Sequence, residues 1–248
     1  MSLDGKTVLV TGGGSGVGAD MAVKFAEAGA RVVIAGRRID ALEAVAGRHR
    51  AISPCAADVT GEQSVADLFK AAGPVDIVIA NAGMAESAPF VKTSLRDWNQ
   101  HLAVNLTGTF LTLRTGLLQM KGRTWGRLIA VASTAGLKGY PYVSAYTAAK
   151  HGVVGLVRSI AQEVARSGVT ANALCPGFLD TEMTERSIAN IVGKTGASPE
   201  EARARLAANN PQGRLIAPAE VSAAALWLCG PGSEGVNGEA VSISGGEI

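Results

Sequence analysis

Short runs of apolar, β-branched residues alternate with longer, alanine-rich segments along most of the chain. The apolar runs have the length and composition of strands and occupy residues 7–10, 31–35, 52–56, 76–80, 127–132, 170–174 and 240–244. The segments between them place apolar residues at helical spacing and occupy residues 16–28, 39–48, 62–71, 95–119, 145–167 and 221–229. Such an alternation is typical of repeated βαβ units.

The predicted strands are continuously apolar rather than alternating in polarity. A strand of this kind is buried on both faces, so the sheet should be parallel, with helices covering each side. The expected fold is therefore a doubly wound α/β domain. Residues 178–214 interrupt the pattern with a long, polar, helix-prone segment, for which a lid over a cleft is the usual use. No linker divides residues 1–248, which predicts one domain.

Composition and charge narrow the class of protein. Glycine supplies 31 of the 248 residues without a three-residue period, which excludes collagen and indicates special backbone positions. The 47% hydrophobic content and the net charge of +2 exclude a disordered chain. The nearly balanced charge gives no general basic field, so neither nucleic acid nor an anionic membrane is an expected partner. No run of 18 apolar residues and no leader-like N-terminus occurs, so a cytoplasmic location is expected.

The three cysteines, Cys55, Cys175 and Cys229, have neither the number nor the spacing of a disulfide framework or a zinc site. We expect them to be small, buried, apolar side chains. His49 and His101 have no cysteines or carboxylates at ligand spacing. No metal is therefore predicted.

The glycine-rich segment 11–18 lies between the first predicted strand and the first predicted helix. It contains Thr11, Gly12, Ser15, Gly16, Val17 and Gly18. A phosphate can rest there on free main-chain N–H groups and on the positive end of the helix dipole. A nucleoside-triphosphate loop is excluded, because Ala19 and Asp20 follow Gly18 where a lysine and a hydroxyl residue are needed. The strict GxGxxG spacing of dinucleotide-binding turns is also absent. A tight turn that binds no ligand therefore remains an alternative interpretation of this segment.

The end of the second predicted strand bears on the choice of dinucleotide. An acidic residue at this place binds the ribose 2′-hydroxyl of NAD, whereas an arginine accommodates the 2′-phosphate of NADP. The strand here is followed by Arg37 and Arg38, and no carboxylate is present to repel a phosphate. This pattern favours NADP as the cofactor, with NAD as the alternative. A third interpretation is that the two arginines bind no ligand and are ordinary solvated charges of a loop.

Tyr146 and Lys150 lie four residues apart on a predicted helix, so their side chains share one face. A nearby ammonium stabilises the phenolate, which would lower the tyrosine pKa and make the side chain a usable proton donor and acceptor. Ser133 follows the predicted strand 127–132, at the edge where open α/β sheets bind their ligands. Taken alone, the spacing of Tyr146 and Lys150 is also compatible with an ordinary helix surface.

These segments together resemble the short-chain dehydrogenase/reductase family over essentially the whole chain. The matching segments are Thr11-Gly12 with Gly16-Val17-Gly18, Asp58-Val59, Asn81-Ala82-Gly83, Asn105, Ser133, Tyr146 with Lys150, and Pro176-Gly177 with Thr181. The resemblance implies a Rossmann-type fold, hydride transfer between a nicotinamide and a carbonyl or secondary alcohol, and a homotetramer. A chance match of so many ordered segments is improbable.

The resemblance also implies roles for single residues. Tyr146 would deliver a proton to the carbonyl oxygen, Ser133 would orient that oxygen, and Lys150 would lower the tyrosine pKa and hold the nicotinamide ribose. Asn105 would keep in place a water that links Lys150 to solvent. The remaining cofactor contacts would come from Asp58 and Val59 at the adenine, from Asn81, Ala82 and Gly83 at the ribose, and from Pro176, Gly177 and Thr181 near the nicotinamide.

Ala80 departs from the family pattern, in which a second asparagine usually precedes Asn81. Some support of the central sheet is therefore expected to come from elsewhere. The apolar candidates to face the substrate are Met84, Leu137, Tyr140, Tyr142, Phe178 and Met183.

The substrate is the least determined part of the prediction. The segment 178–214 balances five acidic against five basic residues, so it is no evident basic clamp for a coenzyme A phosphate. Resemblance to reductases of fatty-acid and polyketide type favours an NADPH-dependent reduction of a 3-oxoacyl thioester. Oxidation of a small cyclic or aromatic secondary alcohol is the second hypothesis, and a non-catalytic dinucleotide-sensing protein is the third.

Overall fold

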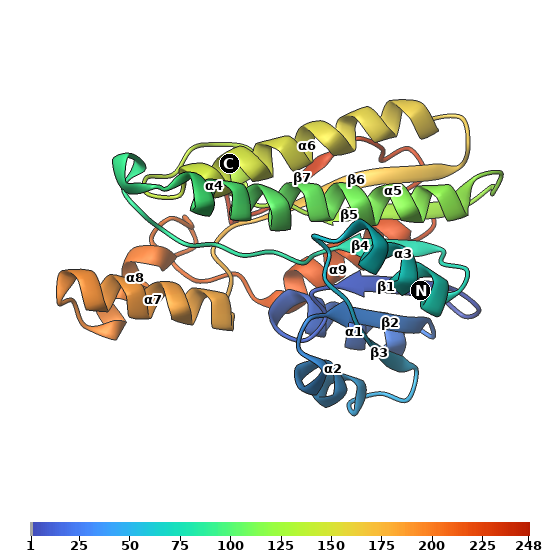
Figure 1. Cartoon of the computed structure of the whole chain (residues 1–248), viewed down its shortest axis with the longest axis horizontal. Coiled ribbons are helices and arrows are strands. Elements are labelled where there is room, and N and C mark those ends of the chain that lie inside the picture. Colours follow the sequence, from blue (N-terminus) through green and yellow to red (C-terminus); the bar gives the residue numbers. More distant parts are fainter. Residues whose placement is uncertain (1) are drawn as a thin grey trace.

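A computed structural model describes residues 2–248, which form a parallel seven-stranded sheet between two layers of helices (Figure 1). The strand order is β3-β2-β1-β4-β5-β6-β7. The strands are β1 (Thr7–Thr11), β2 (Arg31–Gly36), β3 (Ile52–Ala56), β4 (Ile77–Ala80), β5 (Gly126–Val131), β6 (Val169–Pro176) and β7 (Ala240–Ile243). Every neighbouring pair is parallel, which confirms the expected doubly wound fold.

The helices that cover the sheet belong to two groups. One face packs against α3 (Glu62–Ala72), α5 (Gly108–Met120) and α6 (Ser144–Val164), and the other against α1 (Gly16–Glu27), α2 (Ile39–Ala46) and α9 (Pro218–Cys229). In β1, Leu9 enters the first layer, whereas Val8 and Val10 enter the second. Side chains of one strand therefore fill both cores, because successive residues point to opposite faces.

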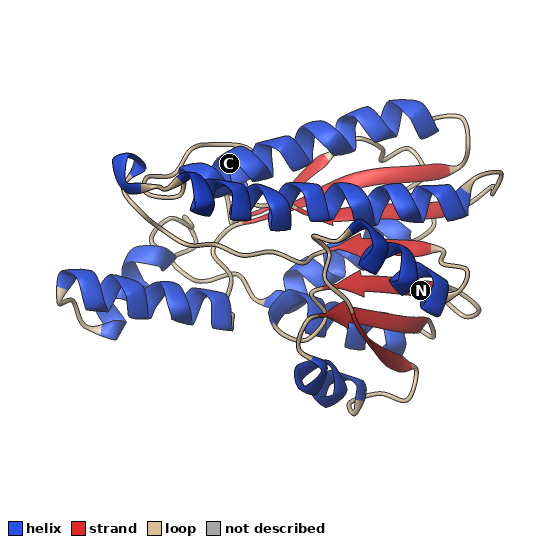
Figure 2. Cartoon of the chain, viewed as in Figure 1, coloured by secondary structure: helices blue, strands red, loops and turns tan. Residues whose placement is uncertain are grey.

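The arrowheads of the strands point toward α7 (Glu182–Thr195) and α8 (Pro199–Ala207), which project beyond the layers (Figure 2). These two helices occupy most of the segment that was predicted to be a lid. Ser198 caps α8, and its hydroxyl accepts from the Glu201 N–H while the Glu201 carboxylate accepts from the Ser198 N–H. Such a capping box starts a short helix firmly.

The helix predicted over 95–119 is interrupted. It comprises α4 (Leu95–Leu102), a π-helical turn (Ala103–Thr107) and α5. Inside the turn, the Asn105 side chain donates to the main-chain oxygen of His101 at 3.1 Å, and the Thr109 hydroxyl donates to that of Asn105 at 2.8 Å. A π-helical turn adds a residue within a helix and often accompanies a functional site.

Among residues 2–248, no helix is long and apolar enough to cross a membrane. The same residues contain no group of three or more histidine, cysteine or acidic side chains arranged to hold a metal ion. Cys175 and Cys229 are buried, as expected, whereas Cys55 is only partly buried. None of the three is in a disulfide.

Candidate active site

The glycine-rich turn between β1 and α1 is shaped by close main-chain approaches. Gly12 and Gly16 have φ of +67° and +52°, in the left-handed region that favours glycine. A Cβ on Gly18 would lie 2.3 Å from the Gly12 carbonyl oxygen and 2.5 Å from Asn81 Nδ2. The turn therefore requires bare backbone at these positions. A cradle of this form fits the diphosphate of a dinucleotide, with Ser15 at the N-cap of α1.

Thr11 and Asn81 tie the ends of β1 and β4 together. The Thr11 hydroxyl oxygen accepts from the N–H groups of Asn81 (3.1 Å) and Ala82 (3.2 Å). In return, Asn81 Nδ2 donates to the carbonyl oxygens of Thr11 (3.0 Å) and Gly12 (3.2 Å). Ala80, directly before Asn81, is buried in the core and has no part in this exchange.

A trough of about 670 Å³ runs from the glycine turn along the carboxyl ends of β2 and β4. Arg37, Arg38, Asp58 and Val59 line it, together with Ala82 and Gly83. Both arginines are exposed. The Thr60 N–H and hydroxyl, which donate to Asp58, and the nearby charge of Arg37 lower the pKa of Asp58. The trough thus brings together the two arginines after β2 and the two residues predicted at the adenine, whereas Asn81 lines the neighbouring cavity.

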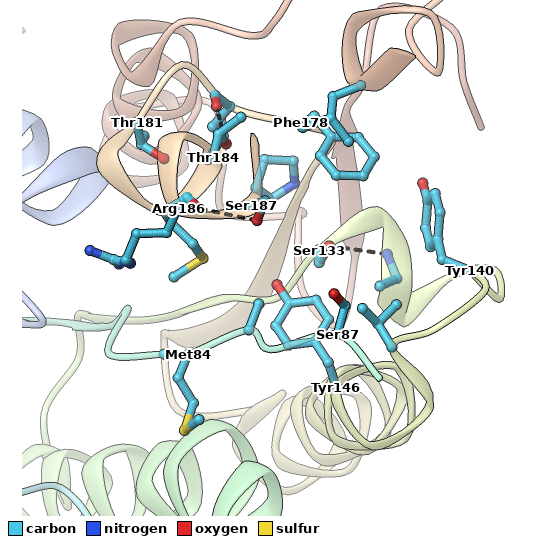
Figure 3. Close-up of a pocket in the computed structure, with 18 of the residues that line it drawn as sticks. Met84, Ser87, Ser133, Tyr140, Tyr146, Phe178, Thr181, Thr184, Arg186 and Ser187 are labelled. Atoms are coloured by element: carbon cyan, nitrogen blue, oxygen red, sulfur yellow. Dashed lines mark hydrogen bonds between the residues drawn. The ribbon is translucent and has the colours of Figure 1, made fainter. Parts of the chain in front are cut away.

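A second cavity, of about 710 Å³, opens beside the trough and contains Ser133, Tyr146 and Lys150 in its wall (Figure 3). Ser133 begins the short helical turn Thr134–Gly136, where its Oγ accepts from the Ala135 N–H at 3.1 Å. Lys150 Nζ lies 5.6 Å from the centre of the Tyr146 ring and donates to the Val131 carbonyl oxygen at 2.7 Å. The three side chains therefore converge on one side of the cavity.

Burial dominates the electrostatics of this trio. It lowers the pKa of Lys150 from 10.5 to about 8, because a buried ammonium loses its hydration. It also raises the pKa of Tyr146, and the neighbouring Ser133 hydroxyl opposes the rise only in part. This direction is opposite to the lowering expected from Lys150, whose Nζ is turned toward the Val131 carbonyl oxygen.

Asn105 is completely buried in the π-helical turn and holds the loop that follows β4. Its Oδ1 accepts from the Met84 N–H and its Nδ2 donates to the Met84 oxygen, both at 3.0 Å. Gly83 is pressed between Asn105 and Lys150, since a Cβ there would lie 3.0 Å from Asn105 Oδ1 and 3.9 Å from Lys150 Nζ. Both Nδ2 hydrogens of Asn105 are thus used, on the main-chain oxygens of Met84 and His101, in fixing this loop beside Lys150.

Most of the predicted substrate residues line the second cavity, namely Met84, Tyr140, Tyr142, Phe178 and Met183. Leu137 does not line it: the turn Thr134–Gly136 directs this side chain against the core beside α6, which corrects the prediction. Tyr142 has a φ of +68°, uncommon for a residue with a bulky side chain, and its carbonyl oxygen accepts from the Ala88 N–H at 2.8 Å.

Pro176, Gly177 and Thr181 also line the cavity, in the connection from β6 to α7. The pattern of the sequence missed the polar residues that α7 contributes. Asn190 Nδ2 donates to the Ser87 hydroxyl at 2.8 Å, and Lys194 Nζ donates to the Ser87 carbonyl oxygen at 3.2 Å. These bonds fasten α7 to the loop after β4. Polar residues occur on several faces of α7, so the sequence alone did not indicate which of them face the loop after β4.

The fold and the site define a dinucleotide-dependent oxidoreductase. They combine a parallel doubly wound sheet, a glycine-rich turn after β1 and a cluster of Ser133, Tyr146 and Lys150. The family model described as short chain dehydrogenase matches residues 6–191, and the chain belongs to this family. The chain is 36% identical to a D-beta-hydroxybutyrate dehydrogenase of Cupriavidus necator, over 99% of each chain. It is 31% identical to the 3-oxoacyl-[acyl-carrier-protein] reductase FabG of Aquifex aeolicus, over 99% of this chain and 98% of the other.

Solved structures give the same result. A variant of the actinorhodin polyketide ketoreductase with NADPH has a TM-score of 0.90 at 32% identity, covering 100% of this chain and 99% of the other. Levodione reductase has a TM-score of 0.92 at 31% identity, covering 98% of each chain. A 3-ketoacyl-(acyl-carrier-protein) reductase of Brucella melitensis complexed with NADH has a TM-score of 0.89 at 30% identity, covering 99% of each chain. The chain is an oxidoreductase of this family, whose enzymes use nicotinamide cofactors.

Proposed function

We propose that the protein reduces the carbonyl of a 3-oxoacyl thioester with NADPH. The observation that carries the proposal is the convergence of Ser133, Tyr146 and Lys150 on a roomy cavity that continues into the dinucleotide trough. The likeness to a FabG reductase and to a polyketide ketoreductase supports this substrate class. Apolar walls from Met84, Phe178 and Met183 suit an acyl chain.

The chain's own residues would divide the chemistry between binding and proton transfer. The bound dinucleotide would supply the hydride. Tyr146 would donate its hydroxyl proton to the carbonyl oxygen as that oxygen gains charge, and Ser133 would hold the oxygen by a hydrogen bond. Lys150 would stabilise the resulting phenolate and bind ribose hydroxyls, while Asn105 would order the water through which the proton is replaced. The turn 11–18 and Asn81–Gly83 would hold the diphosphate and ribose.

Tyr146→Phe tests the catalytic assignment. It should lower carbonyl reduction by at least about 100-fold, the lower end of what a positioned general acid contributes. Binding of NADPH, measured by its fluorescence, should persist. Tyr142→Phe is the comparison variant: Tyr142 lines the same cavity but is exposed, so loss of its hydroxyl should alter KM at most and leave kcat in place. Retained turnover in Tyr146→Phe would remove the assignment.

A second candidate is oxidation of a secondary alcohol. The similarity to a D-beta-hydroxybutyrate dehydrogenase and to levodione reductase favours it, since both enzymes are named for a small molecule. Rates with acetoacetyl thioesters and with a panel of cyclic, aromatic and short hydroxy-acid alcohols would separate the two. A non-catalytic sensor of dinucleotides would bind NADPH and turn over no member of the panel.

The preference for NADPH rests on Arg37 and Arg38, which line the trough without a salt-bridge partner among the described residues. Arg37→Ala should weaken NADPH by at least about tenfold and NADH little, because only NADPH carries the 2′-phosphate. Arg48→Ala, an exposed arginine outside the trough, is the control. Equal losses for both cofactors in Arg37→Ala would favour NAD instead.

A homotetramer is the proposed assembly. Two separate faces carry exposed apolar side chains, with Leu118 of α5 at 65% and Trp227 of α9 at 51% exposure. Such side chains on different faces suit two distinct contacts between copies. Light scattering coupled to size exclusion should give four protomers, and Leu118→Glu or Trp227→Glu should each reduce that number. A monomer in the unaltered protein would contradict the proposal.

A further inference from the structure

The segment that follows β7 turns back beneath the wall of the active-site cavity. Gly245 and Gly246 have φ of +63° and +96°, which only glycine adopts readily. Asn210, beyond α8, packs so closely on Gly245 that a Cβ there would lie 1.9 Å from its Oδ1. This path delivers Glu247 to the interior, where its side chain is only 2% exposed.

The Glu247 carboxylate binds one loop and touches another. The Tyr140 hydroxyl donates to Oε1 at 2.5 Å, and Lys138 Nζ lies 3.0 Å from the same oxygen. The second oxygen, Oε2, is buried without a hydrogen-bond partner and faces Gly177, where a Cβ would lie 3.2 Å away. Lys138 and Tyr140 belong to the loop between β5 and α6, and Gly177 to the connection between β6 and α7. Glu247 thus joins the two walls of the cavity from behind.

These contacts fix an aromatic surface beside the reacting groups. The rings of Tyr140 and Phe178 meet edge to face, with centroids 6.0 Å apart and planes at 87°. Both residues line the cavity, and Figure 3 shows them on the same side of it as Ser133. The Tyr140 hydroxyl also lies 2.7 Å from Thr134 Oγ1. Burial and the Glu247 carboxylate raise the pKa of Tyr140, so its hydroxyl remains protonated and keeps its proton for the bond to Glu247.

We propose that Glu247 is a positioning residue that determines substrate fit: through Tyr140 it holds the aromatic wall against which the larger substituent of the ketone packs. The inference rests on the proposed reduction, because it concerns the same cavity. Glu247 does not line the cavity itself, and among the described residues its carboxylate has polar contacts with Tyr140 and Lys138 but none with Ser133, Tyr146 or Lys150. Its loss should therefore affect substrate binding and leave both the chemical step and the cofactor trough in place.

Steady-state kinetics of Glu247→Ala with NADPH and a ketone tests this role. KM for the ketone should rise at least about fivefold, as expected for loss of a hydrogen bond to a charged group. kcat and the NADPH dissociation constant should stay within about twofold. Glu247→Gln should recover most of the fit, since its amide oxygen still accepts from Tyr140. Glu239→Ala, an exposed carboxylate just before β7, is the matched control and should behave as the unaltered protein.

Tyr140→Phe removes the same hydrogen bond from the other side. If the two residues act as one unit, Glu247→Ala added to Tyr140→Phe should raise KM little further. An unchanged KM in Glu247→Ala, or losses that multiply in the double variant, would overturn the proposal. If neither Glu247 variant folds, the decision falls to Tyr140→Phe, in which an unchanged KM overturns it.

Hydrogen exchange supplies a readout that needs no turnover. In Glu247→Ala, the amides of residues 134–143 should exchange faster than in the unaltered protein and in Glu239→Ala. If the unaltered protein reduces no ketone, the proposed function fails. Hydrogen exchange still decides whether Glu247 holds the loop 134–143 in place through Tyr140. Unchanged exchange in 134–143 would refute the link whatever the activity.

Discussion

Replacing Lys150 by methionine should stabilise the cofactor-free protein at neutral pH while it abolishes turnover. Lys150 is 3% exposed, and burial lowers its pKa from 10.5 to about 8. Its Nζ has one hydrogen bond, to the Val131 carbonyl oxygen. A buried ammonium with so little compensation destabilises the folded state, and methionine fills a similar volume without the charge.

The magnitude follows from the two pKa values. At 1.36 kcal/mol per pKa unit, the drop from 10.5 to about 8 corresponds to about 3 kcal/mol. Because the folded state binds the proton less tightly than the unfolded state, this cost is fully present below pH 8 and fades as the pH rises toward 10.5. Leaving the Val131 oxygen without its donor takes back about 1 kcal/mol. The net gain of Lys150→Met is about 2 kcal/mol at pH 7, and about 2 kcal/mol of it disappears by pH 9.5.

Urea unfolding followed by circular dichroism, at fixed protomer concentration and at several pH values from 7 to 9.5, measures both quantities. The two proteins must be compared at each pH. Burial raises the thiol pKa of Cys175 to about 11 and that of Cys229 to about 12, so both cysteines lower the stability of either protein in alkali. A variant less stable than the unaltered protein at pH 7, or a difference independent of pH, would refute the reasoning.

Two further substitutions probe the scaffold. Gly18→Ala should weaken NADPH binding by at least about tenfold and lower the Tm, because its Cβ would overlap the Gly12 oxygen. Gly193→Ala, with nothing within 4 Å of the added Cβ, should leave the Tm equal or higher, and equal effects would refute the explanation. Arg127→Met should cost about 2–4 kcal/mol in urea unfolding with unchanged KM, because Arg127 is buried and donates to the oxygens of Leu228, Gly126 and Gly168. A changed KM would show that the amino ends of the strands communicate with the cavity.

The strands and the catalytic cluster could be predicted because their signals are local. A continuously apolar strand such as β4 reports burial on both faces, and Tyr146 with Lys150 share a helix face by spacing alone. The π-helical turn around Asn105 could not be predicted in this way. The apolar pattern runs through it without a break, and the Asn105 side chain inside it binds the main chain of Met84, 21 residues earlier, a contact that no local pattern indicates.

Contacts between distant segments account for the other differences. Leu137 follows Ser133 closely enough to suggest the cavity, but it is partly buried and packs against the core cluster that includes Val153 and Val154. Glu247 meets Tyr140 across 107 residues, and no local pattern announces such a meeting. The pKa of Tyr146 depends on the burial of the whole site, which spacing along a helix does not reveal.

The link between Thr11 and Asn81 has a consequence for synthesis of the protein on the ribosome. The hydroxyl of Thr11 accepts from two N–H groups of a segment about 70 residues later, so the glycine-rich turn reaches its final shape only when residues 81–82 are in place. A nascent chain that has produced only the glycine turn has no dinucleotide site. Since a ligand stabilises only the state that binds it, a dinucleotide would offer no help to the first segments of the fold to emerge. A dinucleotide bound at this cradle would therefore protect the finished sheet against unfolding and would not act as a template for folding.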